Sequence, residues 1–208
     1  MNPASPPSPG AGGFVRPARA GDADALTRVQ VASWGCRLAA VVPAELLAEL
    51  TGEEASAIWR DRWREAISNP PTSRHRVLVA VSDAAAPPPA PPAAPPPAAR
   101  SAAREVVGLV SAGPATDADR WPGTDAEIYE FRVQPDLTGQ GHGSRLLQAA
   151  ADTLVSDGFR TASTWVLQAD LDVRRFLESA GWAADGARGE LEVGVSVPVV
   201  RLHTRLSE

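Results

Sequence analysis

Three glycines at alternate positions, Gly139, Gly141 and Gly143, separate a strand-like segment from a helix-like one. Glycines in such a turn let backbone N–H groups converge on one point, and the N-terminus of the next helix adds partial positive charge there. The pattern predicts a cradle for a phosphate-sized anion. A turn whose glycines serve backbone sterics alone is the alternative interpretation.

The segments on either side of the turn have clear periodicities. Alternation along residues 125–133 predicts a strand with Glu127, Tyr129, Phe131 and Val133 on one face and Glu130 on the other. The proline at position 135 ends this strand, because proline cannot donate to a ladder. Apolar residues at helical spacing then predict a helix over 144–155.

Two other phosphate-binding patterns fit this turn poorly. A Walker-type loop needs Gly-Lys-Ser/Thr, and all 20 basic residues of the chain are arginine. A dinucleotide fingerprint needs a glycine where Ser144 stands and an acidic residue at the end of the next strand, and Asp170 lies too far along. An oxidoreductase that binds a nicotinamide nucleotide at this turn is therefore the weaker alternative.

The run Thr138-Gly-Gln-Gly-His-Gly143, after a strand ending in Val-Gln-Pro, resembles the first signature of the GNAT superfamily of acyl-CoA-dependent N-acetyltransferases. Thr138 stands where that family usually has Gln or Arg. Residues 165–182 resemble the second signature, with Asp170 at the usual Asn position and Leu177 at the usual Tyr position. The resemblance extends over most of residues 14–207.

The resemblance implies a single α/β (α+β) domain over residues 14–207. Its mixed, mainly antiparallel sheet of six or seven strands opens into a V at the central strand and carries about four helices, in the order β–α–α–β–β–β–α–β–α–β–β. The Pro/Gly/Ser-rich residues 1–13 are expected to form a disordered tail. The Ala/Pro-rich residues 84–103 are expected to lengthen a loop between two adjacent strands.

The implied reaction moves an acetyl group from acetyl-CoA, as co-substrate, to a primary amine. The acceptor ammonium must lose a proton, an oxyanion must be stabilised, and a thiolate must leave. Glu127 stands at the general-base position of the histone-acetyltransferase relatives, although it could also lie in solvent near the strand end. Tyr129, the single tyrosine, is the candidate acid in place of the tyrosine missing at Leu177, although its strand position also suits packing.

The residues implied to bind the cofactor lie on the central strand, in the glycine turn and in the second signature. Backbone groups of Phe131 and Val133 would pair with the pantetheine arm, and the Phe131 N–H would be the oxyanion donor. His142 is expected to be a surface residue that contributes only its backbone. The full set is Phe131, Arg132, Val133, Thr138, Gly139, Gln140, Gly141, His142, Gly143, Ser144, Asp170 and Phe176.

Composition limits the possible partners. A net charge of −5 leaves no basic footprint for nucleic acid or an anionic membrane, and no apolar run is long enough to span one. With neither such a run nor a leader pattern, a cytoplasmic location is expected. One cysteine and three scattered histidines predict neither a disulfide nor a metal site.

The expected partner is a small-molecule or peptide amine, and a homodimer is compatible with the resemblance. The first two helices would wall the acceptor groove. Trp34, Trp59 and Trp63 are expected to be core residues, with ligand contact as the alternative. Because the tyrosine is missing at Leu177, a non-catalytic acyl-CoA-binding or interaction module on the same fold remains an alternative.

Overall fold

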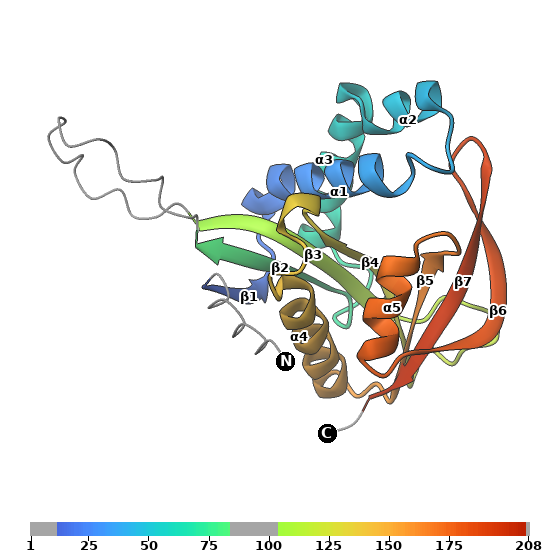
Figure 1. The fold of residues 1–208 in the computed structure, drawn as a ribbon. Coiled ribbons are helices and arrows are strands. Elements are labelled where there is room, and N and C mark those ends of the chain that lie inside the picture. The colour runs from blue at the N-terminus through green and yellow to red at the C-terminus, as the bar shows by residue number, and fades with distance from the viewer. Residues whose placement is uncertain (1–11, 84–103, 207–208) are drawn as a thin grey trace, which may run out of the picture.

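The computed structural model describes residues 12–83 and 104–206. Seven strands form one sheet in the order β1-β2-β3-β4-β5-β7-β6 (Figure 1). Only β4 and β5 run parallel. The predicted insertion at 84–103 and residues 1–11 of the predicted tail lie outside the described residues. The strands are β1 (Gly13–Pro17), β2 (Arg76–Asp83), β3 (Arg104–Pro114), β4 (Asp125–Val133), β5 (Thr161–Leu167), β6 (Ala183–Glu192) and β7 (Ser196–Arg205).

Five α-helices lie in the described residues, in line with the expectation of about four. The residues after Pro43 form two of them, because the extended backbone of Gly52 ends one helix and begins the next. Helices α1 to α3 cover one face of the sheet, and α4 and α5 lie on the other (Figure 1). They are α1 (Ala23–Arg37), α2 (Ala44–Thr51), α3 (Glu53–Ser68), α4 (His142–Ser156) and α5 (Leu171–Ser179).

Each face of the sheet has its own apolar core. On one face α1 and α3 bury Leu26 and Trp63 against β2 and β3. On the other face α4 buries Leu146 and Leu154 in a larger core that includes residues of β4 and β5. The central strands are therefore apolar on both sides, and the glycine turn connects β4 to α4 at their end.

The sheet opens into the predicted V between its two parallel strands. β4 pairs with β5 only from Asp125–Thr161 to Ile128–Thr164. At the last pair the Thr164 hydroxyl donates to the carbonyl oxygen of Ile128 at 2.9 Å. Beyond this point the described residues place no strand beside the free edge of β4.

A β-bulge at Tyr129 changes which side chains of β4 share a face. Ser111 of β3 pairs with Glu130 and Ala112 pairs with Ile128, so Tyr129 has no partner on β3. One extra residue reverses the alternation. Ile128, Phe131 and Val133 consequently all pack in the α4 core, and Glu127 points to the opposite face. The predicted common face of Glu127, Phe131 and Val133 is wrong for this reason.

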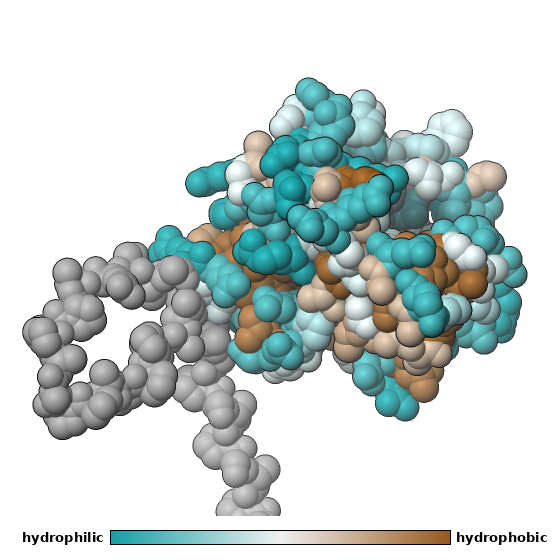
Figure 2. All heavy atoms as spheres, turned by 90° about the horizontal axis from the view of Figure 1, so that it is seen from above, coloured by the Kyte–Doolittle hydropathy of each residue, from teal (hydrophilic) through white to brown (hydrophobic). Residues whose placement is uncertain are grey.

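No helix in the described ranges is long and apolar enough to cross a membrane. The face seen in Figure 2 is mainly hydrophilic, and its hydrophobic side chains lie in separate smaller groups. Such scattered apolar residues are ordinary on a folded surface.

Candidate active site

The glycine turn presents an uninterrupted run of free amides. Gly139 and Gly141 have φ values of 75° and 79°, which only glycine adopts without strain. Helix α4 begins directly afterwards, at His142. Within the described residues, no backbone N–H from position 139 to position 144 donates a hydrogen bond. These N–H groups and the helix N-terminus together can bind a phosphate or pyrophosphate.

Two aromatic rings support this turn from beneath. Phe131 of β4 and Phe176 of α5 are stacked, with their centroids 5.7 Å apart. A Cβ added to Gly143 would lie 3.4 Å from Phe176 and 3.6 Å from Phe131. The glycine therefore lets the start of α4 rest directly on the ring pair.

A cleft of about 480 Å³, here called the α4 cleft, adjoins the free amides. On the other side α1 contributes Ser33, Cys36 and Arg37. The predicted cofactor residues that line it are Phe131, Val133, Thr138, Gly139, Gly141, Gly143, Ser144, Asp170 and Phe176. Its lining extends from the glycine turn to Phe131 and Asp170, beside the opening of the V.

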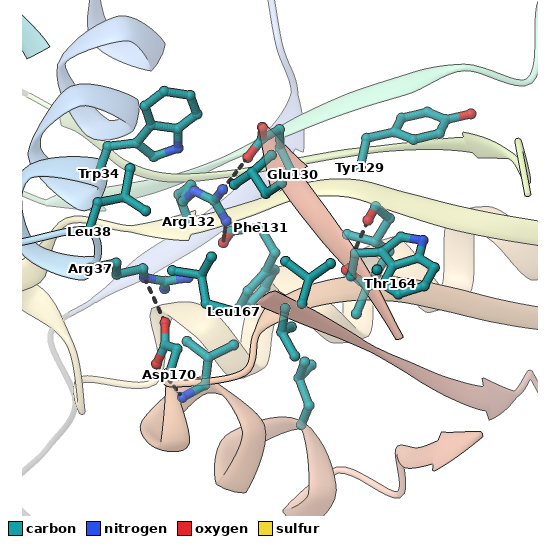
Figure 3. Close-up of a pocket in the computed structure, with 18 of the residues that line it drawn as sticks. Trp34, Arg37, Leu38, Tyr129, Glu130, Phe131, Arg132, Thr164, Leu167 and Asp170 are labelled. Carbon is teal, nitrogen blue, oxygen red and sulfur yellow. Dashed lines mark hydrogen bonds and ion pairs between the residues drawn. The ribbon is translucent and has the colours of Figure 1, made fainter. Parts of the chain in front are cut away.

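A second cavity of about 360 Å³, here called the V cavity, lies where β4 and β5 diverge (Figure 3). Its walls include Trp34 of α1, Leu38 directly after α1, Trp165 of β5 and Leu191 of β6. The two cavities adjoin, because four residues line both: Arg37, Phe131, Asp170 and Val173.

The free edge of β4 faces these two adjoining cavities. The N–H of Gln134 donates to Val107 of β3 at 2.8 Å. Along a strand, N–H groups two residues apart point the same way and adjacent ones point oppositely. The N–H groups of Phe131 and Val133 therefore face the opening of the V, where an extended ligand can pair with them.

Charged groups concentrate where the two cavities meet. Arg132 pairs with Glu130 at 2.7 Å and donates to the Phe131 carbonyl oxygen at 3.0 Å (Figure 3). Arg37 faces Asp170 across the opening, and its Nε lies 3.5 Å from a carboxylate oxygen. Burial, and secondarily the charge of Arg132, lowers the pKa of Arg37 to about 10. The other carboxylate oxygen of Asp170 caps α5 by accepting from the Val173 N–H at 3.1 Å.

The carboxyl group of Glu127, the predicted base, does not line either cavity. It is buried, and its Oε2 accepts hydrogen bonds from the Thr116 N–H at 3.0 Å and from the Thr116 hydroxyl at 2.7 Å. Glu130, the side chain that simple alternation placed on the other face, lines the V cavity. The bulge at Tyr129 brings Glu130 onto the same face of the sheet as Glu127, and of the two only Glu130 reaches a cavity.

Tyr129, the predicted acid, forms part of the V cavity wall but directs its hydroxyl elsewhere. The hydroxyl donates to the Pro114 carbonyl oxygen at 2.6 Å and lies 3.5 Å from the His75 ring. Burial, assisted by the charge of Glu127, raises the pKa of Tyr129 to about 12. Leu177 is buried in the α4 core, and its hydrocarbon side chain has no proton to supply.

Three predicted cofactor residues do not line the α4 cleft: Arg132, Gln140 and His142. The prediction that His142 is a surface residue is wrong, because its side chain is only 1% exposed and contacts Arg145 at 3.0 Å. Burial, with the neighbouring Arg145 charge, lowers the pKa of His142. Thr138 lines the cleft, but its hydroxyl donates to Pro135.

Arg37 was not singled out from the sequence. The sequence favoured Glu127 over Glu130 as the base, and core packing over ligand contact for Trp34. Trp63 is a core residue as predicted, whereas Trp34 lines the V cavity and stacks edge-on against Trp59 at 5.0 Å. Position 37 carries no motif, and it reaches the site only because α1 ends beside the opening of the V. Among the described residues, no group of three or more potential ligands is placed to hold a metal ion.

Comparisons with known proteins agree with this geometry. No curated protein matches the chain in sequence. PaiA N-acetyltransferase from Thermoplasma acidophilum, solved in complex with coenzyme A, is 16% identical, with a TM-score of 0.61 over 91% of this chain and 98% of its own. A GCN5-related N-acetyltransferase from Kribbella flavida is 17% identical, with a TM-score of 0.61 over 93% and 98%.

YncA from Salmonella typhimurium, solved with its cofactor acetyl-CoA, is 17% identical, with a TM-score of 0.58 over 95% of this chain and 96% of its own. At such identities these structures establish the fold. The family model described as the acetyltransferase (GNAT) family matches residues 53–182, which include the glycine turn, the free edge of β4 and the start of α5. The chain therefore belongs to the GNAT acetyltransferase family.

Proposed function

We propose that this protein transfers an acetyl group from acetyl-CoA to a primary amine by direct attack. The observation that carries the proposal is the run of free amides at 139–144, which lies beside the outward-facing edge of β4 along two adjoining cavities. A diphosphate fits the first feature and an amide-containing arm fits the second. Bound acetyl-CoA would supply the thioester that the amine attacks.

The residues of the chain then divide the work by position. The N–H groups of the glycine turn hold the pyrophosphate, and the backbone N–H groups of Phe131 and Val133 align the pantetheine arm. The Phe131 N–H is the donor for the negative charge that develops on the thioester oxygen. The rings of Phe131 and Phe176 keep the turn in place.

We assign the amine side of the reaction to Glu130, because its carboxylate lines the V cavity and that of Glu127 does not. Glu130 accepts a proton from the acceptor ammonium, directly or through water. The N–C bond forms, the C–S bond breaks, and the proton that the nitrogen loses on becoming an amide neutralises the departing thiolate, so the products are an N-acetyl amine and the CoA thiol. Since a thiol has a pKa of about 8.5, the thiolate leaves without a dedicated side-chain acid.

A thiol-release assay with acetyl-CoA and a panel of primary amines tests the proposal. The expected result is amine-dependent release of CoA thiol, with initial-rate plots that intersect, as a ternary complex requires. Parallel plots would instead indicate an acetylated protein intermediate and would exclude direct transfer. If calorimetry shows CoA binding but no amine supports turnover, the protein is the non-catalytic acyl-CoA-binding module.

A further inference from the structure

Arg37, on the wall of the V cavity, has few acceptors for the N–H donors of its guanidinium group. Arg37 is mostly buried, and within the described residues its one ion-pair partner is Asp170, at 3.5 Å and without a hydrogen bond. A guanidinium has five N–H donors in a fixed fork, so most of them have no acceptor among the described protein groups. A buried cation in this state favours binding of an anion.

The neighbouring charges do not meet this demand. Glu130 is paired with Arg132, and Asp170 also caps α5. Glu190, the remaining acidic residue on the cavity wall, accepts a hydrogen bond from Ser196 at 2.7 Å. Arg132 lies close enough to destabilise the charge of Arg37 further. An incoming anion would relieve this repulsion and supply acceptors to the fork.

The cavity also limits the size of its occupant. Trp34, Leu38, Leu167 and Leu191 belong both to its wall and to a third apolar core, in which α2 packs against the β6–β7 connection. There, Leu46 approaches within 2.9 Å of where a Cβ on Gly194 would stand. With this wall closely packed, a volume of about 360 Å³ suits a small molecule.

We propose that the acceptor is a small amine that also carries a carboxylate, that is, an amino acid, and that Arg37 is the residue that binds this carboxylate. The inference rests on the proposed transferase function and extends it to a substrate class. Glu130 then faces the ammonium, and the apolar wall formed by Trp34 and Leu191 receives the side chain. A single amino acid would thus place its carboxylate on Arg37, its ammonium beside Glu130 and its side chain against the apolar wall.

The test compares the common L-amino acids with matched molecules that lack the carboxylate. For each amino acid that supports thiol release, the corresponding amide and decarboxylated amine are assayed. The amide is the sharper comparison, because its amine is less basic and more of it is unprotonated at neutral pH. We expect kcat/KM for the amino acid to exceed that for either analogue by about ten- to hundredfold, the size of a charged hydrogen-bond pair.

Arg37→Gln should remove this preference by raising KM for the amino acid about ten- to hundredfold, and Arg37→Lys should restore part of it. The control is Arg64→Gln, which removes an exposed arginine of α3 that pairs with Asp61. It should leave both parameters unchanged. Thermal melting of each variant checks that the fold is intact.

A binding measurement keeps the inference testable if turnover fails. Calorimetry on the CoA-loaded protein should show binding of an N-acetyl-L-amino acid but not of its amide, and Arg37→Gln should abolish it. Equal use of acids and amides, or no binding of any N-acetyl amino acid, would overturn the inference. A loss of CoA affinity in Arg37→Gln with the acid preference intact would also overturn it, because Arg37 would then contact the cofactor.

Discussion

Glu127 and Glu130 lie three residues apart on one strand, yet only Glu130 reaches the V cavity. We therefore expect Glu130→Gln to lower kcat by about 10²- to 10⁴-fold, the usual contribution of a positioned general base, with little change in thermal stability. Glu127→Gln should mainly lower stability, because it weakens the buried hydrogen bonds to Thr116. Steady-state kinetics and thermal melting of both variants measure the contrast.

The opposite pattern would return the base to Glu127. If Glu127→Gln loses activity as severely as Glu130→Gln and melts like the parent protein, the buried carboxylate acts through water. The two variants are matched controls, since each changes one carboxyl to an amide on the same strand.

Tyr129 offers a spectroscopic test, because it is the single tyrosine of the chain. Its pKa is raised to about 12 by burial and by the charge of Glu127. The folded protein therefore keeps this proton where the unfolded chain, with a pKa of about 10, releases it. Stability is full below pH ~10 and falls as the pH rises toward 12.

Absorbance titration of the phenolate should show no ionisation until the pH exceeds that of a free tyrosine. Tyr129→Phe should remove this part of the alkaline loss of stability in urea unfolding. Ionisation near the ordinary pKa of tyrosine would mean that the hydroxyl is open to solvent, and Tyr129 would again be a candidate acid.

The sequence predicted the position of the central strand well but not the faces of its side chains. Period-two alternation is a property of regular strands, and nothing in Glu127-Ile-Tyr-Glu130 marks the extra residue. The bulge arises from pairing with β3, which is a long-range event. Arg37 was missed for a related reason, because its role depends on where α1 ends relative to β5.

At the scale of elements, the glycine turn is the feature that the sequence predicted most securely. Gly139 and Gly158 form a matched pair, since both have positive φ and neither has an atom within 4 Å of an added Cβ. Alanine at either position should destabilise the protein by about 1–2 kcal/mol. Only Gly139→Ala should also weaken CoA binding, by about tenfold or more, because relieving the strain rotates an amide out of the cradle.

Calorimetry with CoA and urea unfolding of both variants separate the two effects. Unchanged CoA affinity in Gly139→Ala, together with the expected loss of stability, would show that the turn serves the fold alone. A similar affinity loss in Gly158→Ala would mean that general destabilisation explains the result.

Other elements were predicted only in part, for physical reasons. Strand β6 spans Ala183–Glu192, but after Ala183 the large apolar residues typical of a strand begin only near residues 191–193. Its first half is rich in Ala and Gly, lies at the edge of the sheet and contains a register shift after Ala184. Exposed edge strands need no apolar alternation, so they leave little periodic signal.

At the scale of the molecule, the two halves of the sheet separate where β4 and β5 diverge, and a cluster of ion pairs, here called the clasp, links them. The loop after β3 carries Asp117 and Asp119, and both bind Arg201 of β7, at 2.7 and 2.6 Å. Asp185 of β6 binds the same guanidinium at 2.7 Å. The Trp165 ring nitrogen also donates to Asp117 at 3.1 Å. This clasp ties the loop after β3 to β6 and β7, and it contacts Trp165, which also lines the V cavity.

Arg201→Met should therefore loosen the joint between the halves and change its response to acid. The hydrogen bond from Arg201 lowers the pKa of Asp119 to about 2, below the unfolded value of about 3.9. The folded protein thus binds fewer protons than the unfolded chain in this window, and its stability falls as the pH drops from about 4 to about 2. In Arg201→Met the three carboxylates repel one another at neutral pH, and protonation relieves that repulsion.

We accordingly expect the stability difference between the parent protein and Arg201→Met to be largest near neutral pH and to shrink toward pH ~2. Urea unfolding at stepped pH measures it, with Arg64→Met as a control that removes only an exposed pair. A difference that stays constant across this range would mean that Arg201 stabilises by packing on Trp165, 5.5 Å from its ring centre, and not by charge. Because Arg201 and Asp117 both contact Trp165, which lines the V cavity but not the α4 cleft, the same variant should also raise KM for the acceptor more than it weakens CoA binding at the glycine turn.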